Sequence, residues 1–525
     1  MESLNINELS IEQKIGQTLI ARCYISEADK EFVLKMVRNH SIGGIQVWPG
    51  PDCEALTAEI RAAADYPVLI CADMEQGFPG SGDMIPSAMT LSSIGDEQLA
   101  YDFAQITAIN AKKRGYSVVW GPCVDLIDRN AACKIPRIFG SDPERTCRFA
   151  EAIARGYTDN GMILSAKHFL AGADHTVDTH LTEAVSGRTR EELEAYELKP
   201  YYYLMERGVL SGVMTSHTRY PNIDPEYPCT LSPKMLALLR DRGYDGLIFT
   251  DSFAMMAILQ KYKEEDIYGL ALAAGCDLIL PNLRVPFQTS YEYMLDCYKR
   301  GLYTEAQLDN AVRRVIRAQN ASQKPAKYPD SLPGKEEIIR RISQDGVCAV
   351  LRDGAEAALK PVKKRLFIVQ TANLYRTEGE IRGEINAEGG ISEDREYPEV
   401  REMILERFPD AEVMSVSQYP GQKQIEAVSY ASTKADELVF ITYNLVSSYM
   451  GSEMLSDRML ALMNSVQDKI GAELHIGNPY ALEDLPHLPR ILASFGWGDS
   501  LRYMLDALAG RYVPKGTIPV RLNLK

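Results

Sequence analysis

The sequence concentrates groups capable of acid–base chemistry in one short stretch, residues 166–180, "AKHFLAGADHTVDTH". The chain has seven histidines in 525 residues, and three of them, His168, His175 and His180, lie in this stretch beside aspartates. A carboxylate that accepts a hydrogen bond from an imidazole fixes its tautomer and raises its basicity, which suits a general acid near neutral pH. Asp178 and His180, two residues apart, could form such a pair.

Other interpretations of this stretch remain open. His168 could be a core histidine whose ring nitrogens are satisfied by its neighbours, and the Asp and His residues could bind a metal ion. The Asp-x-His spacing permits a metal, although the sequence offers no second ligand pair such as HxxxH. His175 competes with His180 for the role of the acid, and a solvated loop histidine is its simpler interpretation.

Short apolar runs must position these groups. Between about residues 10 and 320, nearly continuous apolar runs alternate with helical stretches, as expected for parallel strands covered on both faces. The runs span residues 43–49, 67–73, 116–125, 162–169, 209–217, 246–251 and 276–282.

Many of these runs end in a polar or ionisable residue, namely Asp73, Asp125, His168, His217, Asp251 or Asn282. A carboxylate such as Asp251 could be a nucleophile, a metal ligand or a helix N-cap, and the N-cap is the commonest of the three. Both a (β/α) barrel and a doubly wound sheet place their ligands at the carboxyl ends of the strands. Six strands whose polar last residues converge favour the barrel over the doubly wound sheet.

The chain divides into two regions. Residues 321–335, "ASQKPAKYPDSLPGK", are rich in Pro, Lys and Ser and predict a linker. Beyond it, strand-like runs span residues 365–371, 411–416, 437–444, 472–480 and 490–496. We therefore expect an α/β protein with a TIM-like (β/α)8 barrel over 1–320, the linker over 321–335, and a smaller α/β sandwich domain over 336–525.

The composition indicates which classes of partner the protein can bind and in which cell compartment it works. A net charge of −15 opposes binding to nucleic acid or to an anionic membrane surface, because both require basic patches. The sequence has no apolar run long enough for a membrane span and no secretory leader at its start, which predicts a cytoplasmic protein. The ten cysteines form no CxxC pair, so we expect buried, reduced thiols.

From about residue 10 to the C-terminus, the chain resembles glycoside hydrolase family 3, and most of all its two-domain β-N-acetylglucosaminidase branch. That branch carries the motif K-H-[FI]-P-G-x-G-x-x-x-x-D-[ST]-H. The residues that match it in register are Lys167, His168, Phe169, Asp178, Thr179 and His180. Further matches, in family order, are "IEQKIGQTL", "ADMEQG", "PRIFGSDPE", "GVMTSHTRYPNIDPEYPCTLSP", "GLIFTDSFAM" and "IGNPY".

The resemblance implies a retaining exo-β-glycosidase that acts on a β-linked carbohydrate and needs no cofactor or metal. It implies that Asp251 is the nucleophile and that His180 is the acid/base, with Asp178 as its partner. The residues implied to bind the sugar hydroxyls are Asp73, Arg137, Lys167 and His168, with Met214 and His217 in or beside the pocket. Because a neutral imidazole would not repel phosphate, phosphate is a possible alternative to water as the acceptor.

The chain also departs from the family pattern. Leu170 to Ala173 replace the motif P-G-x-G, so that only Gly172 can take a positive φ cheaply, and Ser252 stands where an Asp is common. Two rival functions follow. One is a glucosidase or xylosidase type, in which Glu453 of the second domain would supply the acid/base, and the other is a non-catalytic sugar-binding barrel.

Overall fold

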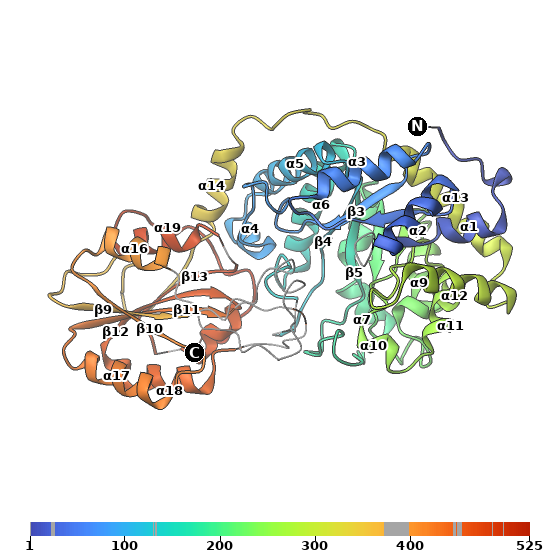
Figure 1. Ribbon diagram of the computed structural model, residues 1–525. Coiled ribbons are helices and arrows are strands. Elements are labelled where there is room, and N and C mark those ends of the chain that lie inside the picture. Colours follow the sequence, from blue (N-terminus) through green and yellow to red (C-terminus); the bar gives the residue numbers. More distant parts are fainter. Residues whose placement is uncertain are drawn as a thin grey trace. The chain divides into compact units, whose positions relative to one another are not determined.

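The computed structural model describes residues 2–22, 27–129, 131, 134–371, 398–444, 448, 454–485, 487–496 and 498–524. The chain forms two compact units, which Figure 1 shows coloured in chain order. The first unit is built from Met1–Met84 and Asp96–Ile339, and the second takes Ile85–Gly95 together with most of residues 340–525. Each of the two alternating regions seen in the sequence therefore has a sheet of its own.

Seven parallel strands of the first unit lie side by side in chain order and curl into a barrel-like sheet. They are β1 (Ile20–Arg22), β2 (Gly44–Gln46), β3 (Leu69–Asp73), β4 (Val118–Cys123), β5 (Ile163–Phe169), β6 (Gly212–Thr215) and β7 (Leu247–Phe249). Leu278 bridges Phe249 of β7, and Ile279 bridges Leu19 beside β1, so this segment joins the two edges of the sheet. The predicted TIM-like barrel is confirmed, with a bridged segment in place of a full eighth strand.

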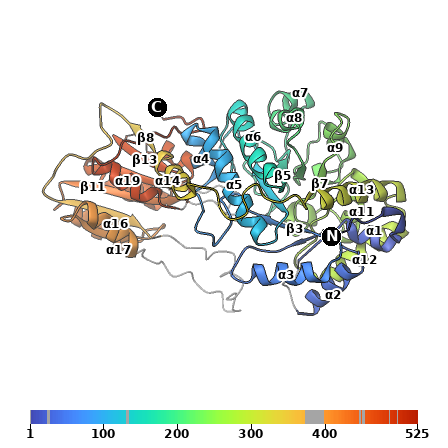
Figure 2. The ribbon, with the colours of Figure 1, turned by 90° about the horizontal axis from the view of Figure 1, so that it is seen from above.

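Helices connect the strands and lie outside them, as Figure 2 shows. They are α1 (Ile11–Gln17), α2 (Glu27–Arg38), α3 (Cys53–Ala63), α5 (Glu97–Lys113), α6 (Pro143–Asp159), α7 (Arg190–Ala195), α8 (Lys199–Glu206), α9 (Pro233–Arg240), α10 (Met256–Leu259), α11 (Glu264–Ala274), α12 (Phe287–Lys299) and α13 (Glu305–Ala321). Short 3-10 turns span Ile6–Glu8 and Cys229–Leu231. Ser10, Thr189 and Thr304 begin α1, α7 and α13 with capping boxes, which satisfy the first backbone N–H groups of each helix.

Apolar side chains from the strands fill the barrel interior. Leu69, Trp120, Met214 and Phe249 belong to this cluster, and each is at most 3% exposed. A barrel packed in this way is a solid core rather than a pore, so ligands must bind in the loops at the ends of its strands.

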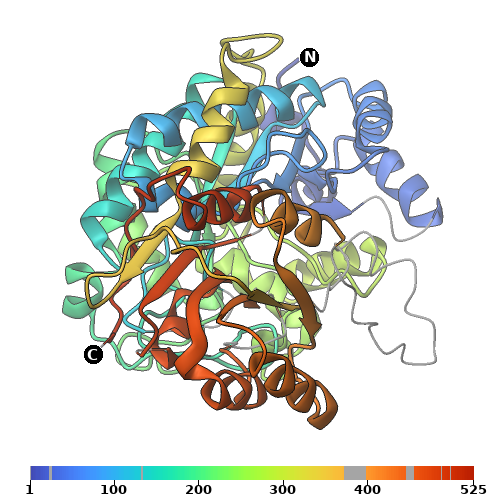
Figure 3. The ribbon, with the colours of Figure 1, turned by 90° about the vertical axis from the view of Figure 1, so that its left-hand side faces the viewer.

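The second unit is a six-stranded sheet between two layers of helices (Figure 3). Its strand order is β10 (Glu412–Val416), β9 (Arg365–Gln370), β11 (Glu437–Asn444), β12 (Ile470–Gly477), β13 (Arg490–Ser494) and β8 (Cys348–Leu351). All pairs are parallel except β13 with β8. The helices are α14 (Lys335–Asp345), α16 (Pro398–Arg407), α17 (Gln422–Ser432), α18 (Asp457–Ser465) and α19 (Ser500–Leu508), with 3-10 turns at Gln467–Lys469 and Pro479–Asp484.

One helix of the second unit comes from the middle of the first region of the sequence. In α4 (Ala88–Ile94), Ser93 Oγ donates a hydrogen bond to the carbonyl of Gly346, and Thr90 Oγ1 accepts one from the N–H of Phe495. No pattern in the sequence indicates that α4 belongs to the second unit. The boundaries 1–320, 321–335 and 336–525 stay a prediction.

Two expectations from the composition can be compared with the structure. The eight cysteines that it describes are free and buried, as expected for reduced thiols. In the described residues, none of the helices has the length and apolar character that crossing a bilayer would demand.

Candidate active site

Asp251 lies in the loop directly after β7. Its Oδ1 accepts a 2.7 Å hydrogen bond from the backbone N–H of Ser252. Burial alone would raise the pKa of Asp251, but electrostatic interactions with three nearby histidines and the hydrogen bond from Ser252 outweigh burial and hold the pKa below its usual value. These histidines are His168, His217 and His180. The carboxylate is therefore ionised at neutral pH, as a nucleophile must be.

Asp178 and His180 form a hydrogen-bonded pair in the loop after β5. Asp178 Oδ1 lies 2.7 Å from His180 Nδ1 and also accepts a 2.9 Å hydrogen bond from the backbone N–H of His180. Because an ionised carboxylate can only accept, Nδ1 carries a proton, and Nε2 is the atom that can exchange a proton with a bound molecule. The Asp178 side chain is 1% exposed and that of His180 is 23% exposed, so the ring alone is accessible.

Two backbone hydrogen bonds tie this pair to the loop that carries Asp251. The N–H of Ala257 donates to the carbonyl of Thr179 at 3.1 Å, and the N–H of Met256 donates to the carbonyl of His180 at 3.3 Å. Both donors belong to α10, which begins five residues after Asp251. The main chain thus fixes the relation between a carboxylate and an imidazole that are far apart in the sequence.

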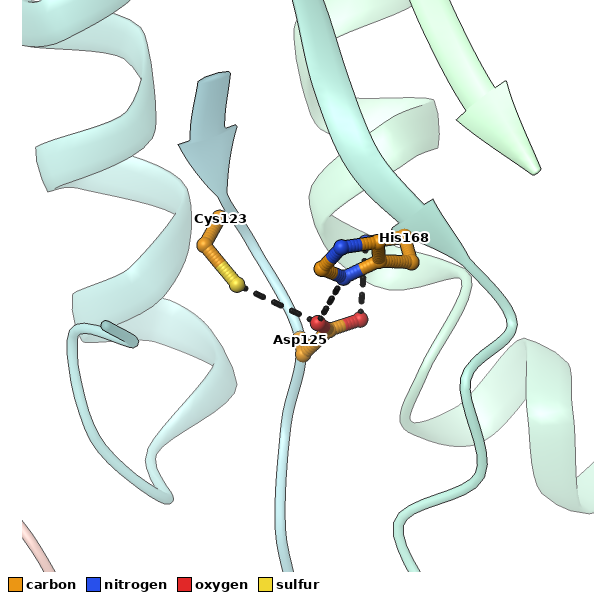
Figure 4. Close-up of side chains that lie close together, drawn as sticks. All are labelled: Cys123, Asp125 and His168. Carbon is orange, nitrogen blue, oxygen red and sulfur yellow. Dashed lines mark hydrogen bonds and ion pairs between the residues drawn. The ribbon is translucent and has the colours of Figure 1, made fainter. Parts of the chain in front are cut away.

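His168 is held at the end of β5 by Asp125, as Figure 4 shows. Asp125 Oδ2 accepts from His168 Nδ1 at 2.8 Å, and Oδ1 accepts from the backbone N–H of His168 at 2.9 Å. Burial alone would raise the pKa of Asp125, but the charge of His168 and the hydrogen bonds lower it to about 2. The ring is therefore oriented by a buried carboxylate, and its Nε2 is left for a ligand.

Cys123 completes a group of three side chains whose ligand atoms lie within 4.8 Å of one another. Burial raises the pKa of the Cys123 thiol well above its usual value, so its sulfur is neutral and donates a 3.2 Å hydrogen bond to Asp125. A metal would need the thiolate and would compete with the hydrogen bond between Asp125 and His168. The chemistry of these donors favours a hydrogen-bonded support for the imidazole over a metal centre.

A chain of alternating charges crosses the ends of β3 and β5. The Lys167 ammonium lies 2.5 Å from Asp73 Oδ1 and 2.6 Å from Glu75 Oε1. Arg137 binds Glu75 through two parallel hydrogen bonds of 2.8 and 2.7 Å, the strong bidentate geometry. Lys167 is 2% exposed, whereas the Asp73 side chain is 40% exposed, so Asp73 is the member of this chain that a ligand can reach most easily.

His217 connects the end of β6 to the loop of Asp251. Its Nε2 lies 3.1 Å from the carbonyl of Ser252 and must carry the proton, and its Nδ1 lies 2.8 Å from Thr230 Oγ1. Burial lowers the pKa of His217, so the ring is neutral. Met214, in β6, packs in the apolar interior of the barrel beneath this level and is 3% exposed.

The structure separates His175 from the other candidates. Its ring lies against Gly172, its Nδ1 accepts from the N–H of Val177 at 3.3 Å, and its buried Nε2 has no hydrogen-bond partner among the residues that the structure describes. Burial, with the charge of Lys134, lowers the pKa of His175 to about 4. The expectation of a solvated loop histidine is wrong, because the ring packs against the loop and stays neutral at pH 7.

The sequence reasoning missed Glu75 and left Glu453 undecided. Glu75 lies inside the quoted motif "ADMEQG", which is the only signal for it, and its carboxylate joins Lys167 to Arg137. The two cations outweigh burial and hold the pKa of Glu75 far below its usual value. Glu453, the acid proposed for the rival glucosidase type, lies outside the described residues.

Comparison with solved structures supports the two-domain fold. The chain superposes with a TM-score of 0.83 on a structure described as a glycoside hydrolase family 3 beta-N-acetylglucosaminidase from Paenibacillus sp. str. FPU-7, at 24% identity and covering 98% of this chain and 100% of that one. It superposes with a TM-score of 0.80 on the beta-glucoside phosphorylase BglX, at 23% identity and covering 98% and 94% of the two chains.

Curated relatives share the barrel region. A beta-hexosaminidase of Nitrosomonas eutropha is 31% identical over 237 residues, which cover 43% of this chain and 68% of the relative. A beta-hexosaminidase of Stenotrophomonas maltophilia is 34% identical over 244 residues, covering 43% and 70%. The model of the glycosyl hydrolase family 3 N terminal domain matches residues 10–318, more than half of the chain. The chain therefore belongs to glycosyl hydrolase family 3.

Proposed function

We propose that this glycoside hydrolase is a retaining exo-β-glycosidase of the β-N-acetylglucosaminidase (β-N-acetylhexosaminidase) type, which removes a terminal non-reducing sugar from its carbohydrate substrate. The observation that carries the proposal is the Asp178–His180 pair, bound through the backbone to the loop of the ionised Asp251. Similarity to curated beta-hexosaminidases supports the choice of sugar.

The reaction would proceed in two steps that use side chains alone. First, Asp251 attacks the anomeric carbon while His180, protonated at Nε2, gives that proton to the departing glycosidic oxygen. Asp178 stabilises the imidazolium before this transfer and holds Nδ1–H throughout. Then Nε2 takes a proton from water, which attacks the anomeric carbon and breaks its bond to Asp251, so that the sugar leaves with its configuration retained.

The groups around this pair suit a bound sugar. Asp73, Arg137, Lys167 and His168 would hydrogen-bond its hydroxyl groups. Glu75 and Asp73 together balance the charges of Lys167 and Arg137, and Asp73, the more exposed of the two carboxylates, can accept hydrogen bonds from hydroxyl groups. His217 would support the nucleophile loop from below, and Met214 would form the apolar floor.

A trapping experiment tests the nucleophile. Incubation with a 2-fluoro β-glycoside, followed by peptide mass mapping, should label the peptide that contains Asp251. Asp251→Ala should stay folded, show no label and lose turnover even of 4-nitrophenyl β-N-acetylglucosaminide. Turnover within tenfold of wild type, or a label on another peptide, contradicts the assignment, and an unlabelled wild type supports the sugar-binding rival. A panel of 4-nitrophenyl β-glycosides would test the choice of N-acetylglucosamine over glucose or xylose.

Leaving-group dependence tests the acid. His180→Ala should cost about 10²–10⁴ in rate with substrates whose leaving groups need a proton. The loss should be smaller with 4-nitrophenolate, which leaves with little protonation. If Glu453→Ala shows this dependence and His180→Ala does not, the rival type with a Glu acid is correct.

Phosphate is a second candidate acceptor, and one observation favours it. The ionisable side chains that act most strongly on the pKa of Asp251 are three imidazoles. A second carboxylate at ~4 Å would repel phosphate by about 4 kcal/mol at an effective dielectric of ~20, whereas a neutral imidazole does not. The proposed compartment is the cytoplasm, which supplies phosphate, and the eight free cysteines accord with its reducing conditions.

Product analysis separates hydrolysis from phosphorolysis. The enzyme is incubated with an aryl β-N-acetylglucosaminide and inorganic phosphate, and a sugar 1-phosphate is sought by phosphorus NMR. Its appearance supports phosphate as an acceptor. If it is absent and phosphate does not raise the rate, the enzyme is a hydrolase only.

A further inference from the structure

A buried lysine holds the loop that leads from β5 to the acid/base pair. Lys134 is 8% exposed, and its ammonium donates hydrogen bonds to the carbonyl of Ala171 at 2.9 Å and to the carbonyl of Gly172. In the part of the chain that the structure describes, no carboxylate forms an ion pair with it. The charges of Asp125 and Glu197 act on the ammonium without a direct ion pair and offset part of the cost of burying it. Its hydrogen bonds go instead to two carbonyls of the loop, which calls for a reason.

The conformation of the loop supplies that reason. Leu170 has φ of 57° and Gly172 has φ of 78°, so the chain turns twice through the left-handed region within three residues. A leucine in this region is strained and persists only where its surroundings impose it. The loop has neither the proline nor either glycine of the P-G-x-G motif to set this path by itself, because Gly172 stands at the x position.

Other side chains bind the same four residues from different elements. Ser216 Oγ donates to the carbonyl of Leu170 at 2.5 Å, and Thr218 Oγ1 donates to that of Ala171 at 3.1 Å. Glu197 Oε1 accepts from the N–H of Ala173 at 2.8 Å. Lys134 contributes the only cationic donor among these contacts of the described residues, and hydrogen bonds from a charged donor are about twice as strong as neutral ones.

We propose that Lys134 is a positioning residue for His180, and that its two hydrogen bonds set the path of residues 170–173 so that the imidazole meets the glycosidic oxygen. The proposal rests on the proposed role of His180 as the acid. Lys134 touches neither substrate nor reacting atoms in this role. A displacement of about 1 Å in the reacting geometry can cost about 10²-fold in rate.

The chain offers a matched control at the other end of β5. The ammonium of Lys112 donates to the carbonyls of Gly161 and Ser322 at 3.2 and 2.8 Å. Gly161 precedes β5, whereas Ala171 and Gly172 follow it. Lys112→Met therefore removes the same kind of interaction without touching the loop of His180.

The test measures kcat/KM for an aryl β-N-acetylglucosaminide with a good leaving group and for an alkyl one with a poor leaving group. Lys134→Met should lower the rate with the poor leaving group by about 10- to 100-fold more than with the good one. Lys134→Arg, which keeps the charge and the donors, should recover most of the difference. Lys112→Met should leave the ratio of the two rates at the wild-type value.

The outcomes are separable. If Lys134→Met lowers both rates equally, or neither, the lysine is only structural and the proposal is overturned. If Lys134→Met does not fold, Thr218→Val, which removes the second bond to the Ala171 carbonyl, must shift the ratio in the same direction, and an unchanged ratio overturns the proposal. His180→Ala is the reference. If it too leaves the ratio of the two rates unchanged, the proposed function fails. If it changes the ratio strongly while Lys134→Met does not, only the positioning role of Lys134 is overturned.

Discussion

At the scale of the residue, the site depends on carboxylates that orient imidazoles. Asp178 holds His180 and Asp125 holds His168, each through one bond to the ring and one to the backbone N–H of the same histidine. This double contact fixes the rotation of the ring as well as its tautomer. The two rings therefore present Nε2, and not Nδ1, to whatever binds beside Asp251.

The charge of Asp178 can be tested apart from its geometry. Asp178→Asn keeps an oxygen that can accept both hydrogen bonds but removes the negative charge that favours the imidazolium. We expect a loss of about 10²-fold in kcat/KM with poor leaving groups and a smaller loss with 4-nitrophenolate. Rates measured with both kinds of leaving group check this. An equal loss with both, or no loss with either, would contradict an electrostatic role for Asp178.

Residue types indicated the proposed reacting groups but not the side chains that support them. Asp251, Asp178 and His180 were identifiable because each follows an apolar run or falls within a motif, and the structure brings them together. Lys134 and Glu197 carry no such signal, because a lysine or a glutamate is usually solvated. Only the fold shows that both are at most 8% exposed and bind the same loop.

At the scale of the element, the loop after β5 sets the position of Asp178 and of His180, the proposed acid. Its inner part is bound by Lys134 and Glu197. Its outer part contains Glu183, whose carboxylate binds Arg219 Nε at 2.7 Å and the ammonium of Lys261 at 2.5 Å. Asp178 and His180 lie in the sequence between these two bound parts, so their position depends on the whole loop.

Gly172 is the position where this loop tolerates least change. A Cβ built there would lie 2.4 Å from ring atoms of His175, and the φ of 78° is unfavourable for any other residue. We expect Gly172→Ala to lower stability by about 1–3 kcal/mol and to reduce turnover, because the loop or the ring must move. Thermal unfolding and kinetics with a poor leaving group measure the two effects.

Two further variants separate the clash with His175 from the backbone cost of the positive φ. Gly187→Ala in the same loop, where a Cβ meets nothing within 4 Å, should match wild type in both assays. Gly172→Ala combined with His175→Ala removes the clash but not the backbone cost, so it should recover part of the loss. If Gly172→Ala is as stable and active as wild type, the loop is more adaptable than these contacts imply.

The strands were predictable to differing degrees. Six of the seven apolar runs of the first region contain β2 to β7, because strands buried on both faces have continuous hydrophobicity. The run 276–282 forms bridges through Leu278 and Ile279 rather than a named strand. β1 was missed, since its three residues, which include Arg22, do not stand out as an apolar run.

At the scale of the whole molecule, the second unit carries a polar group that the mechanism does not use. Glu473 lies in β12 at 0% exposure, and Thr442 Oγ1 donates a hydrogen bond to its Oε1. Its Oε2 has no partner in the described part of the chain. Burial raises the pKa of Glu473 to about 8, although the hydrogen bond from Thr442 lowers it. The folded protein therefore holds this carboxyl group in its neutral form at pH 7.

This raised pKa makes stability depend on pH with a definite sign. An unfolded glutamate ionises near its ordinary pKa of 4.5, so between that pH and about 8 the folded state binds a proton that the unfolded state has lost. The contribution of Glu473 to the free energy of unfolding should therefore fall by about 1.4 kcal/mol for each pH unit in this window. The contribution is fully present below pH 4.5 and is lost as the pH rises through 8.

Glu473→Gln should remove this slope, because the amide is neutral at every pH and its oxygen can still accept from Thr442. The free energy of unfolding of the variant minus that of wild type should therefore be about 3 kcal/mol larger at pH 7 than at pH 4.5. Urea unfolding of the full chain at several pH values, followed by hydrogen exchange in peptides of β11 and β12, measures the slope in this unit. Glu402→Gln, an exposed carboxyl on α16, is the control and should leave the slope as in wild type. If Glu473→Gln also keeps the wild-type slope, Glu473 is ionised in the fold, and its burial must be offset by a partner other than Thr442.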